Sequence, residues 1–193
     1  MGLDEQQRKI IRELIRNPRI SDNKISKRTG IPVMTVNRKR KLLEEKMIIR
    51  YYMSLDKGEF GMHIFRAKNL YVIKFKIGIT REQYLRTMEI QPKWRHFNSK
   101  YVSLAYLGEK EGHLALMIIL DARDESHLVE EFNGKIVPFL REKLGDDCIE
   151  DIETTALSKL IRVHHNYLPY TNIEKGKIKD SWSDNDIFVD EVE

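Results

Sequence analysis

The first 50 residues alternate hydrophobic and polar positions at the period of an α-helix. A first helix is predicted to begin after Asp4, whose carboxylate can cap it, and to end before Pro18. A second, shorter helix is predicted between Ser21, a favourable N-cap residue, and Gly30, which favours a helix C-terminus. A third follows almost at once over residues 31–46. Two short helices joined tightly behind a longer one are typical of a helix-turn-helix domain.

The third predicted helix has an apolar side and a basic side. The side chains expected in the core are Val33, Val36, Leu43 and Met47. At about 100° per residue, Arg38 and Lys41 project on the opposite side, within a run of four basic residues. Recognition helices approach base edges with their first half. The expected DNA-binding residues are Met34, Thr35, Asn37, Arg38, Lys39 and Lys41. Taken alone, the basic run also fits a solvated surface.

Beyond the helices, β-branched and aromatic residues at 48–52 predict a strand, as in a winged variant of the motif. Alternating hydrophobic positions then predict four strands and two helices. The strands are expected at residues 71–77, 102–107, 114–120 and 149–163, and the helices at 80–90 and 124–143. Asn133, Gly134 and Pro138 should weaken or bend the second of these helices. The βαββαβ order is that of a ferredoxin-like domain, so the predicted fold class is α+β.

Four parts of the chain follow from this pattern. They are a helix-turn-helix domain at 1–55, a polar, glycine-bearing hinge at 56–65, a ferredoxin-like dimerisation and effector domain at 66–165, and an acidic C-terminal extension at 166–193. The extension is polar with few apolar residues. Disorder and loose packing on another subunit both fit such a composition.

The predicted strand at 114–120 is apolar on both faces. In a ferredoxin-like monomer the helices cover one side of the sheet, which leaves the other side bare. Such a side usually marks a partner surface, and a two-fold dimer through the sheets is the economical solution. The expected dimer contacts are Ala115, Met117 and Ile119. The alternative is that the C-terminal extension buries this face.

Charge is distributed unevenly along the 193 residues, which is more informative than the net charge of +4. Residues 1–55 contain 14 Lys and Arg against 6 Asp and Glu. Residues 56–165 contain 17 of each, and residues 166–193 contain 3 against 7. A basic head, a neutral middle and an acidic tail indicate that only the first domain meets a polyanion.

Side chains for covalent or metal chemistry are scarce. A single cysteine, Cys148, excludes an intramolecular disulfide and a cysteine-built zinc site. The six histidines show no metal-ligand spacing, and no phosphate-binding loop or nucleophile elbow is found. No apolar run approaches the roughly 20 residues that span a bilayer. We therefore expect no cofactor, no metal, no membrane partner and no enzymatic activity, and a cytoplasmic location.

The first domain resembles the head of the Lrp/AsnC, or feast–famine, family of transcription regulators. The resemblance extends over residues 3–61. Its features are the opening Leu3 and Asp4, the run Arg19, Ile20 and Ser21, then Gly30, and the exit formed by Leu43, Glu44, Glu45, Ile48 and Ile49. The resemblance implies a three-helix DNA-binding domain, a hinge strand, and a βαββαβ domain for effector binding and dimerisation.

Two departures from the family pattern affect the site. Arg40 stands where the family usually places an aliphatic core residue, while Leu42 points outward. Either Arg40 extends to the edge of the core or the helix is rolled. Family members often bind amino acids near a Gly-x-Tyr-Asp sequence between strands two and three of the second domain. The corresponding loop here, residues 108–113, lacks the Tyr-Asp pair, which argues against an amino-acid effector.

These observations favour a sequence-specific transcription regulator that binds double-stranded DNA as a homodimer or a higher even oligomer. The alternative is an enzyme on the same scaffold, because the sirohaem decarboxylases resemble Lrp proteins and use histidines near the sheet. His96 and His113 could take such roles. However, the signatures of that group are not found, and a basic run at 38–41 has no purpose in a haem enzyme.

Overall fold

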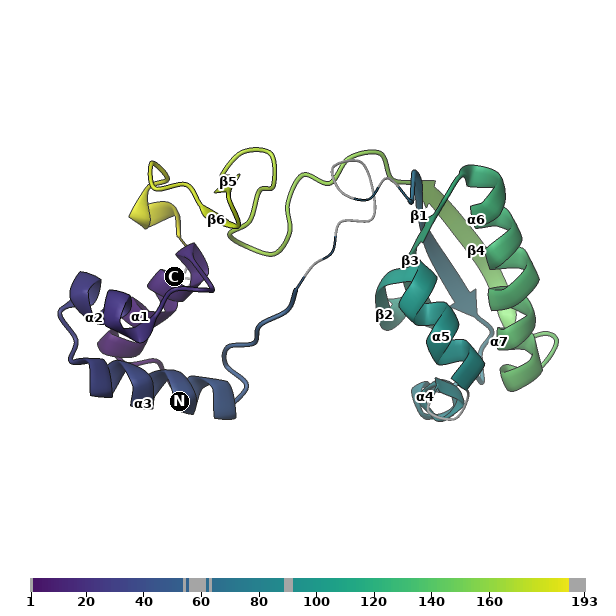
Figure 1. Ribbon diagram of the computed structural model, residues 1–193. Coiled ribbons are helices and arrows are strands. Elements are labelled where there is room, and N and C mark those ends of the chain that lie inside the picture. The colour runs from purple at the N-terminus through teal and green to yellow at the C-terminus, as the bar shows by residue number, and fades with distance from the viewer. Residues whose placement is uncertain (1, 54, 56–61, 63, 89–91, 188–193) are drawn as a thin grey trace. The chain divides into compact units, whose positions relative to one another are not determined.

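The computed structural model describes residues 2–53, 55, 62, 64–88 and 92–187 (Figure 1). The chain forms two compact units, and the first of them is built from two separate stretches of the sequence. This helical unit combines Met1–Ser54 with Leu160–Glu193, whereas the sheet unit is continuous over Leu55–Lys159. The helical unit is therefore discontinuous in sequence.

Three helices open the chain, namely α1 (Glu5–Arg16), α2 (Asp22–Thr29) and α3 (Val33–Glu45). Asp4 caps α1 by accepting a hydrogen bond from the Gln7 N–H at 2.8 Å, and the Gln7 side chain accepts one from the Asp4 N–H at 2.9 Å. Ser21 caps α2, and Gly30 ends it with φ at 71°. The three predicted helices are thus confirmed. Their shared core consists of Ile10, Leu14, Ile20, Ile25, Ile31 and Val36.

The strand predicted at residues 48–52 is wrong. Instead, α3 ends in a tight turn in which the Ile48 N–H donates to the Leu43 carbonyl at 2.9 Å. Met47 has φ at 57° and takes the left-handed place that glycine usually fills in such a turn. Ile49 then packs partly against the helical core. Part of the β-branched run therefore closes a helix, and no strand forms among the described residues between 46 and 55.

The sheet unit confirms the βαββαβ order of a ferredoxin-like domain. Its strands are β1 (Ala67–Phe75), β2 (Val102–Lys110), β3 (His113–Ala122) and β4 (Ile149–Ala156). They are antiparallel and lie in the order β2-β3-β1-β4. Its helices are α4 (Arg81–Met88), α5 (Pro92–Tyr101), α6 (Glu125–Glu131) and α7 (Val137–Leu144). Alternate residues of β1 are buried, which places one face of this strand in the core.

The sheet unit differs from the sequence prediction at several points, and its first strand spans Ala67–Phe75 instead of residues 71–77. Helix α5 was not expected, because its sequence combines aromatic and basic residues without a clear period. The last strand ends at Ala156 instead of residue 163. A π-helical turn, η1 (Phe132–Ile136), joins α6 to α7. Pro138 lacks the N–H that an α-helix would need at this point, so the predicted irregularity takes the form of a wider turn.

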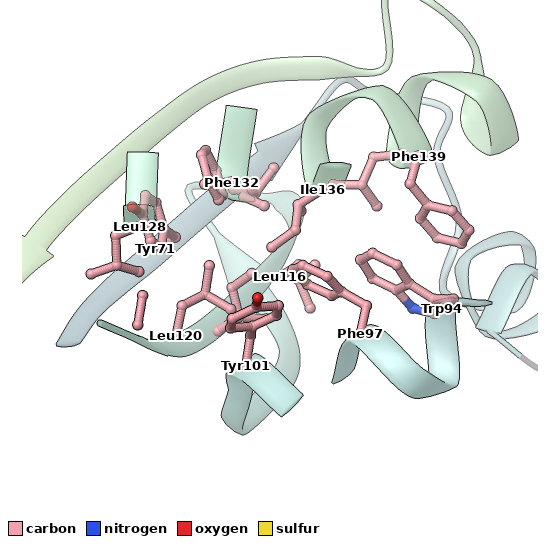
Figure 2. Packing of buried hydrophobic residues seen from close by; sticks show 14 of the residues in the cluster. Tyr71, Trp94, Phe97, Tyr101, Leu116, Leu120, Leu128, Phe132, Ile136 and Phe139 are labelled. Atoms are coloured by element: carbon pink, nitrogen blue, oxygen red, sulfur yellow. The ribbon is translucent and has the colours of Figure 1, made fainter. Parts of the chain in front are cut away.

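Aromatic rings fill the core between the helices and the sheet (Figure 2). Trp94 of α5 stacks on Phe139 of α7 with ring centroids 4.0 Å apart. Tyr71 of β1 stacks on Phe132 at 3.8 Å. Figure 2 shows the Trp94 ring from α5 directly beside the Phe139 ring from α7, with Phe97 next to Trp94. The helices are thus held on one face of the sheet.

After β4 the chain returns to the helical unit. Strands β5 (Ile173–Glu174) and β6 (Lys177–Ile178) pair as a short hairpin, followed by the 3-10 turn η2 (Asp184–Asp186). In Figure 1 this segment lies beside α1, on the side away from α3. The described part of the extension therefore folds and packs on the helical unit of its own chain. The sequence had suggested either disorder or loose packing on another subunit, and neither describes this arrangement.

Candidate nucleic-acid interface

The outer side of α3 presents two cations. Arg38 and Lys41 are exposed, and within the described part of the chain neither takes part in an ion pair or a side-chain hydrogen bond. Met34, which is 78% exposed, lies one turn before Arg38 on the same side. Thr35, which is partly buried, lies beside it. Four of the six predicted DNA-binding residues therefore share one solvent-facing surface.

The other two predicted DNA-binding residues have partners inside the protein. The Asn37 amide donates to the Asp22 carboxylate on α2 at 2.8 Å. The Lys39 ammonium pairs with Asp4, the N-cap of α1. This bond and the bond from the Gln7 N–H lower the pKa of Asp4 below its ordinary value. Both contacts join α3 to a neighbouring helix.

Arg40 lies on the core side of α3, between Val36 and Leu43, which are both fully buried. Its guanidinium extends to the edge of the core and donates to the Ile20 carbonyl at 3.2 Å and to Asp22 at 3.1 Å. Burial lowers the pKa of Arg40, but bonds to Glu44 and Asp22 outweigh this effect and raise it overall. Of the two alternatives given for Arg40, its extension to the edge of the core is therefore the one that the structure shows.

Two residues assigned to the apolar stripe of α3 do not belong to it. Val33 is 38% exposed and Met47 is 60% exposed. Val33 begins the helix, and Met47 falls in the turn beyond its end, so neither is covered by α1 or α2. The buried residues of α3 are Val36 and Leu43, and the partly buried Arg40 lies between them at the helical period.

Helix α2 adds two cations that the sequence analysis did not single out. Lys24 and Lys27 are exposed and have no ion-pair partner among the described residues. By contrast, Arg28 pairs with Glu13 of α1 at 2.8 Å. The first helix of a helix-turn-helix crosses the DNA backbone, where lysines bind phosphates. The sequence feature that could have pointed to these two lysines is the excess positive charge of residues 1–55.

The sheet has the bare face that its sequence pattern predicts. Met117 and Ile119 of β3 are half-buried and alternate with residues directed at the helices, whereas Ala115, the third predicted dimer contact, is already fully buried within this chain. In the neighbouring strand β2, Leu104 pairs with Ile119 and Tyr106 with Met117, and both are exposed. On the other side, β1 sets Leu70 beside Ile119 and Val72 beside Met117. The described part of the C-terminal extension belongs to the other unit.

The loop between β2 and β3 is a two-residue hairpin turn. Glu111 and Gly112 both have positive φ, at 53° and 77°, which is the pattern of a type I′ turn. His113 bonds the Phe75 carbonyl through Nδ1 at 2.9 Å, so one of its ring nitrogens has a structural role. The turn is therefore compact, and one ring nitrogen of the adjacent His113 is occupied by a backbone hydrogen bond.

One cavity of about 260 Å³ lies between α6 and β1, on the β4 side of the sheet. It is lined by Asn69, Tyr71, Val129, Phe132, Asn133, Ile152 and Thr154. No lining side chain is charged, so the cavity offers no ion pair to the carboxylate or ammonium of an amino acid. Among the described residues, no group of three ligands could hold a metal ion. Within the same residues, no helix is long and apolar enough to cross a bilayer.

Comparison with known proteins agrees with this architecture. A family model described as winged helix-turn-helix DNA-binding matches residues 3–50. A Neisseria meningitidis transcriptional regulator in complex with L-methionine shares 19% identity, with a TM-score of 0.61, over 88% of this chain and 98% of the other. Escherichia coli AsnC shares 17% identity, with a TM-score of 0.61, over 85% and 97%. Bacillus subtilis LrpC shares 18%, with a TM-score of 0.60, over 84% and 99%. No curated protein sequence matches the chain.

Proposed function

We propose that this chain, which has the two-domain fold of the Lrp/AsnC regulators, is a transcription regulator that binds specific sequences in double-stranded DNA. The observation that carries the proposal is the outer side of α3, where Arg38 and Lys41 are exposed without an ion pair among the described residues. A guanidinium held near the middle of a recognition helix can make a bidentate contact with guanine. Because DNA is the partner, we expect the protein to act in the cytoplasm.

The six DNA-binding residues divide into two roles under this proposal. Met34, Thr35, Arg38 and Lys41 approach the DNA, with Arg38 reading a base edge and Lys41 binding phosphate. Asn37 and Lys39 position α3, because their polar groups bond Asp22 and Asp4. Lys24 and Lys27 of α2 supply further phosphate contacts. Two observations support this division: Arg38 and Lys41 are exposed, whereas Asn37 and Lys39 bond residues within the helical unit.

We also propose that two copies pair through the bare sheet faces. Exposed apolar side chains on a sheet are stabilised when a second copy covers them, and a two-fold axis lets the same patch serve both partners. Met117 lies near the middle of this patch, with Tyr106 on one side and Val72 on the other. Two helical units in such a dimer would address two half-sites on the DNA.

An amino-acid effector is not proposed at the β2–β3 turn, which is a compact two-residue turn without the family's Tyr-Asp pair. The enzyme alternative is not favoured either. The similar structures named above are regulators, and one ring nitrogen of His113 is bound to the Phe75 carbonyl.

Selection of bound DNA sequences by the wild type, Arg38→Ala and Lys41→Ala tests the function. Arg38→Ala should relax the preference at one base position in each half-site, at about 1–3 kcal/mol. Lys41→Ala is the matched control: it should weaken binding to all sequences alike and reduce the slope of log affinity against log salt by about one. A wild type that selects no sequence would refute the regulator. An unchanged motif with Arg38→Ala would show that Arg38 is not a reader.

A further inference from the structure

Residues 160–187, called here the C-terminal segment, have a framework of their own. Asn172 is fully buried and organises the segment from within. Its amide donates to the Asn166 carbonyl at 2.8 Å, and its side-chain oxygen accepts from the Leu168 N–H at 2.9 Å. The Asn172 backbone carbonyl accepts from the Lys179 N–H at 2.8 Å, which closes the β5–β6 hairpin. The segment is therefore a folded element.

The segment holds the last turn of α1 at two points. The Tyr167 hydroxyl donates to the Ile15 carbonyl at 2.9 Å. Carbonyls in the last turn of a helix have no partner within it, so this bond satisfies a group that would otherwise be free. The Arg16 guanidinium donates to the Lys179 carbonyl at 3.4 Å and the Trp182 carbonyl at 3.3 Å, and it pairs with Asp184. Arg16 is only 8% exposed, so these contacts are well covered.

Apolar burial supports the same attachment. Ile178 of β6 is fully buried and Ile187 is 2% exposed, although most of the segment around them is polar and exposed. Residues 1–54 alone are few for an independent domain, since small domains bury a low fraction of their surface and are marginally stable. The hydrophobic cluster shared by the three helices contains six buried side chains. The buried side chains of Ile178 and Ile187 therefore contribute to the stability of this unit.

We propose that the C-terminal segment is a constituent of the DNA-binding unit that holds α1 and thereby positions α3. This inference rests on the proposed function. Ile10 and Leu14 of α1 share a core with Val36 of α3, so the placement of α3 depends on α1. The segment lies on the side of α1 away from α3 (Figure 1) and acts without covering the outer side of α3. Asp184 pairs with Arg16 and Asp180 pairs with Lys177, so these two carboxylates are neutralised within the segment and its contact with α1.

Hydrogen exchange and DNA affinity of the full chain test this inference. Ile178→Ala removes a buried side chain, and Ile161→Ala removes one that is 71% exposed in the same segment. Removing buried methyl and methylene groups leaves a cavity and weakens the packing of the elements around it. In Ile178→Ala, the α1 amides should therefore exchange at least about tenfold faster, and the affinity for selected DNA should fall at least about threefold. The β1 and β3 amides should not change, and Ile161→Ala should change neither quantity.

Tyr167→Phe is a milder variant that keeps the test valid if Ile178→Ala does not fold. It removes one hydrogen bond to α1 and should accelerate exchange in the last turn of α1 several-fold. Faster exchange confined to residues 160–187, with α1 and the DNA affinity unchanged, would overturn the inference. If the wild type binds no DNA, the proposed function fails. The exchange of α1 then decides on its own whether the segment holds this helix.

Discussion

Replacement of Asn37 by alanine separates positioning from base reading. Asn37 donates to Asp22 at 2.8 Å, and Asp22 also accepts from Arg40 at 3.1 Å. Because Arg40 stays in place, the variant does not leave Asp22 without a cation. A hydrogen bond to a charged group contributes about 1.5–3 kcal/mol. Asp22 is partly exposed, so water replaces part of the lost bond, and we expect the free energy of unfolding to fall by about 1–1.5 kcal/mol.

The DNA-binding result follows from the same geometry. If Asn37 positions α3, then Asn37→Ala should select the same motif as the wild type and bind every sequence more weakly. Denaturant unfolding measures the stability, and selection of bound sequences measures the motif. Asn23→Ala is the matched control, because Asn23 is an exposed asparagine on α2 and its loss should change stability by less than about 0.5 kcal/mol. Unchanged stability of Asn37→Ala together with a changed base preference would refute the positioning role.

Three further predictions concern assembly, pH and salt. Met117→Asp should reduce the oligomer to a monomer in light scattering because it buries an unpaired charge, whereas Ile77→Asp, at a position 86% exposed, should not. A monomeric wild type at micromolar concentration would contradict the dimer. The pKa of Asp4 is lowered in the folded state, so its contribution to stability is present above its ordinary value of 3.8 and lost as the pH falls through the folded value. The difference in stability between wild type and Asp4→Asn, which keeps a good N-cap, should therefore shrink as unfolding is measured at lower pH; a constant difference would contradict this. DNA affinity should fall by orders of magnitude between about 50 and 200 mM salt, and a flat response would remove the phosphate contacts.

The C-terminal segment changes what counts as the DNA-binding domain. The model of the winged helix-turn-helix family ends at residue 50, while the structural unit also includes residues from 160 onward. The chain therefore passes between the two units twice. Removal of the last 34 residues would leave the helix-turn-helix sequence intact but take away the partners of Arg16 and the cover on α1.

The sequence by itself determined the elements whose signals are local. The cap residues Asp4, Ser21 and Gly30 set the start of α1 and both ends of α2, because each acts on backbone groups within a few residues. Alternation over the strands predicted the βαββαβ order and the two-sided apolar character of β3. The strand predicted at residues 48–52 failed because a β-branched run can also close a helix, and among the described residues no neighbouring strand pairs with it.

Only the tertiary structure decided which polar groups of α3 are bound within the protein and which are exposed. Asn37 is 15 residues from its partner Asp22, and Lys39 is 35 residues from Asp4. Helical periodicity gives the direction of a side chain but not the element that lies opposite it, so these two residues looked equivalent to Arg38 and Lys41. Arg16 contacts carbonyls 163 and 166 residues away, and no sequence period links them. Such pairings depend on how the folded elements meet, because the energy of each bond is realised only after the core has brought its partners together.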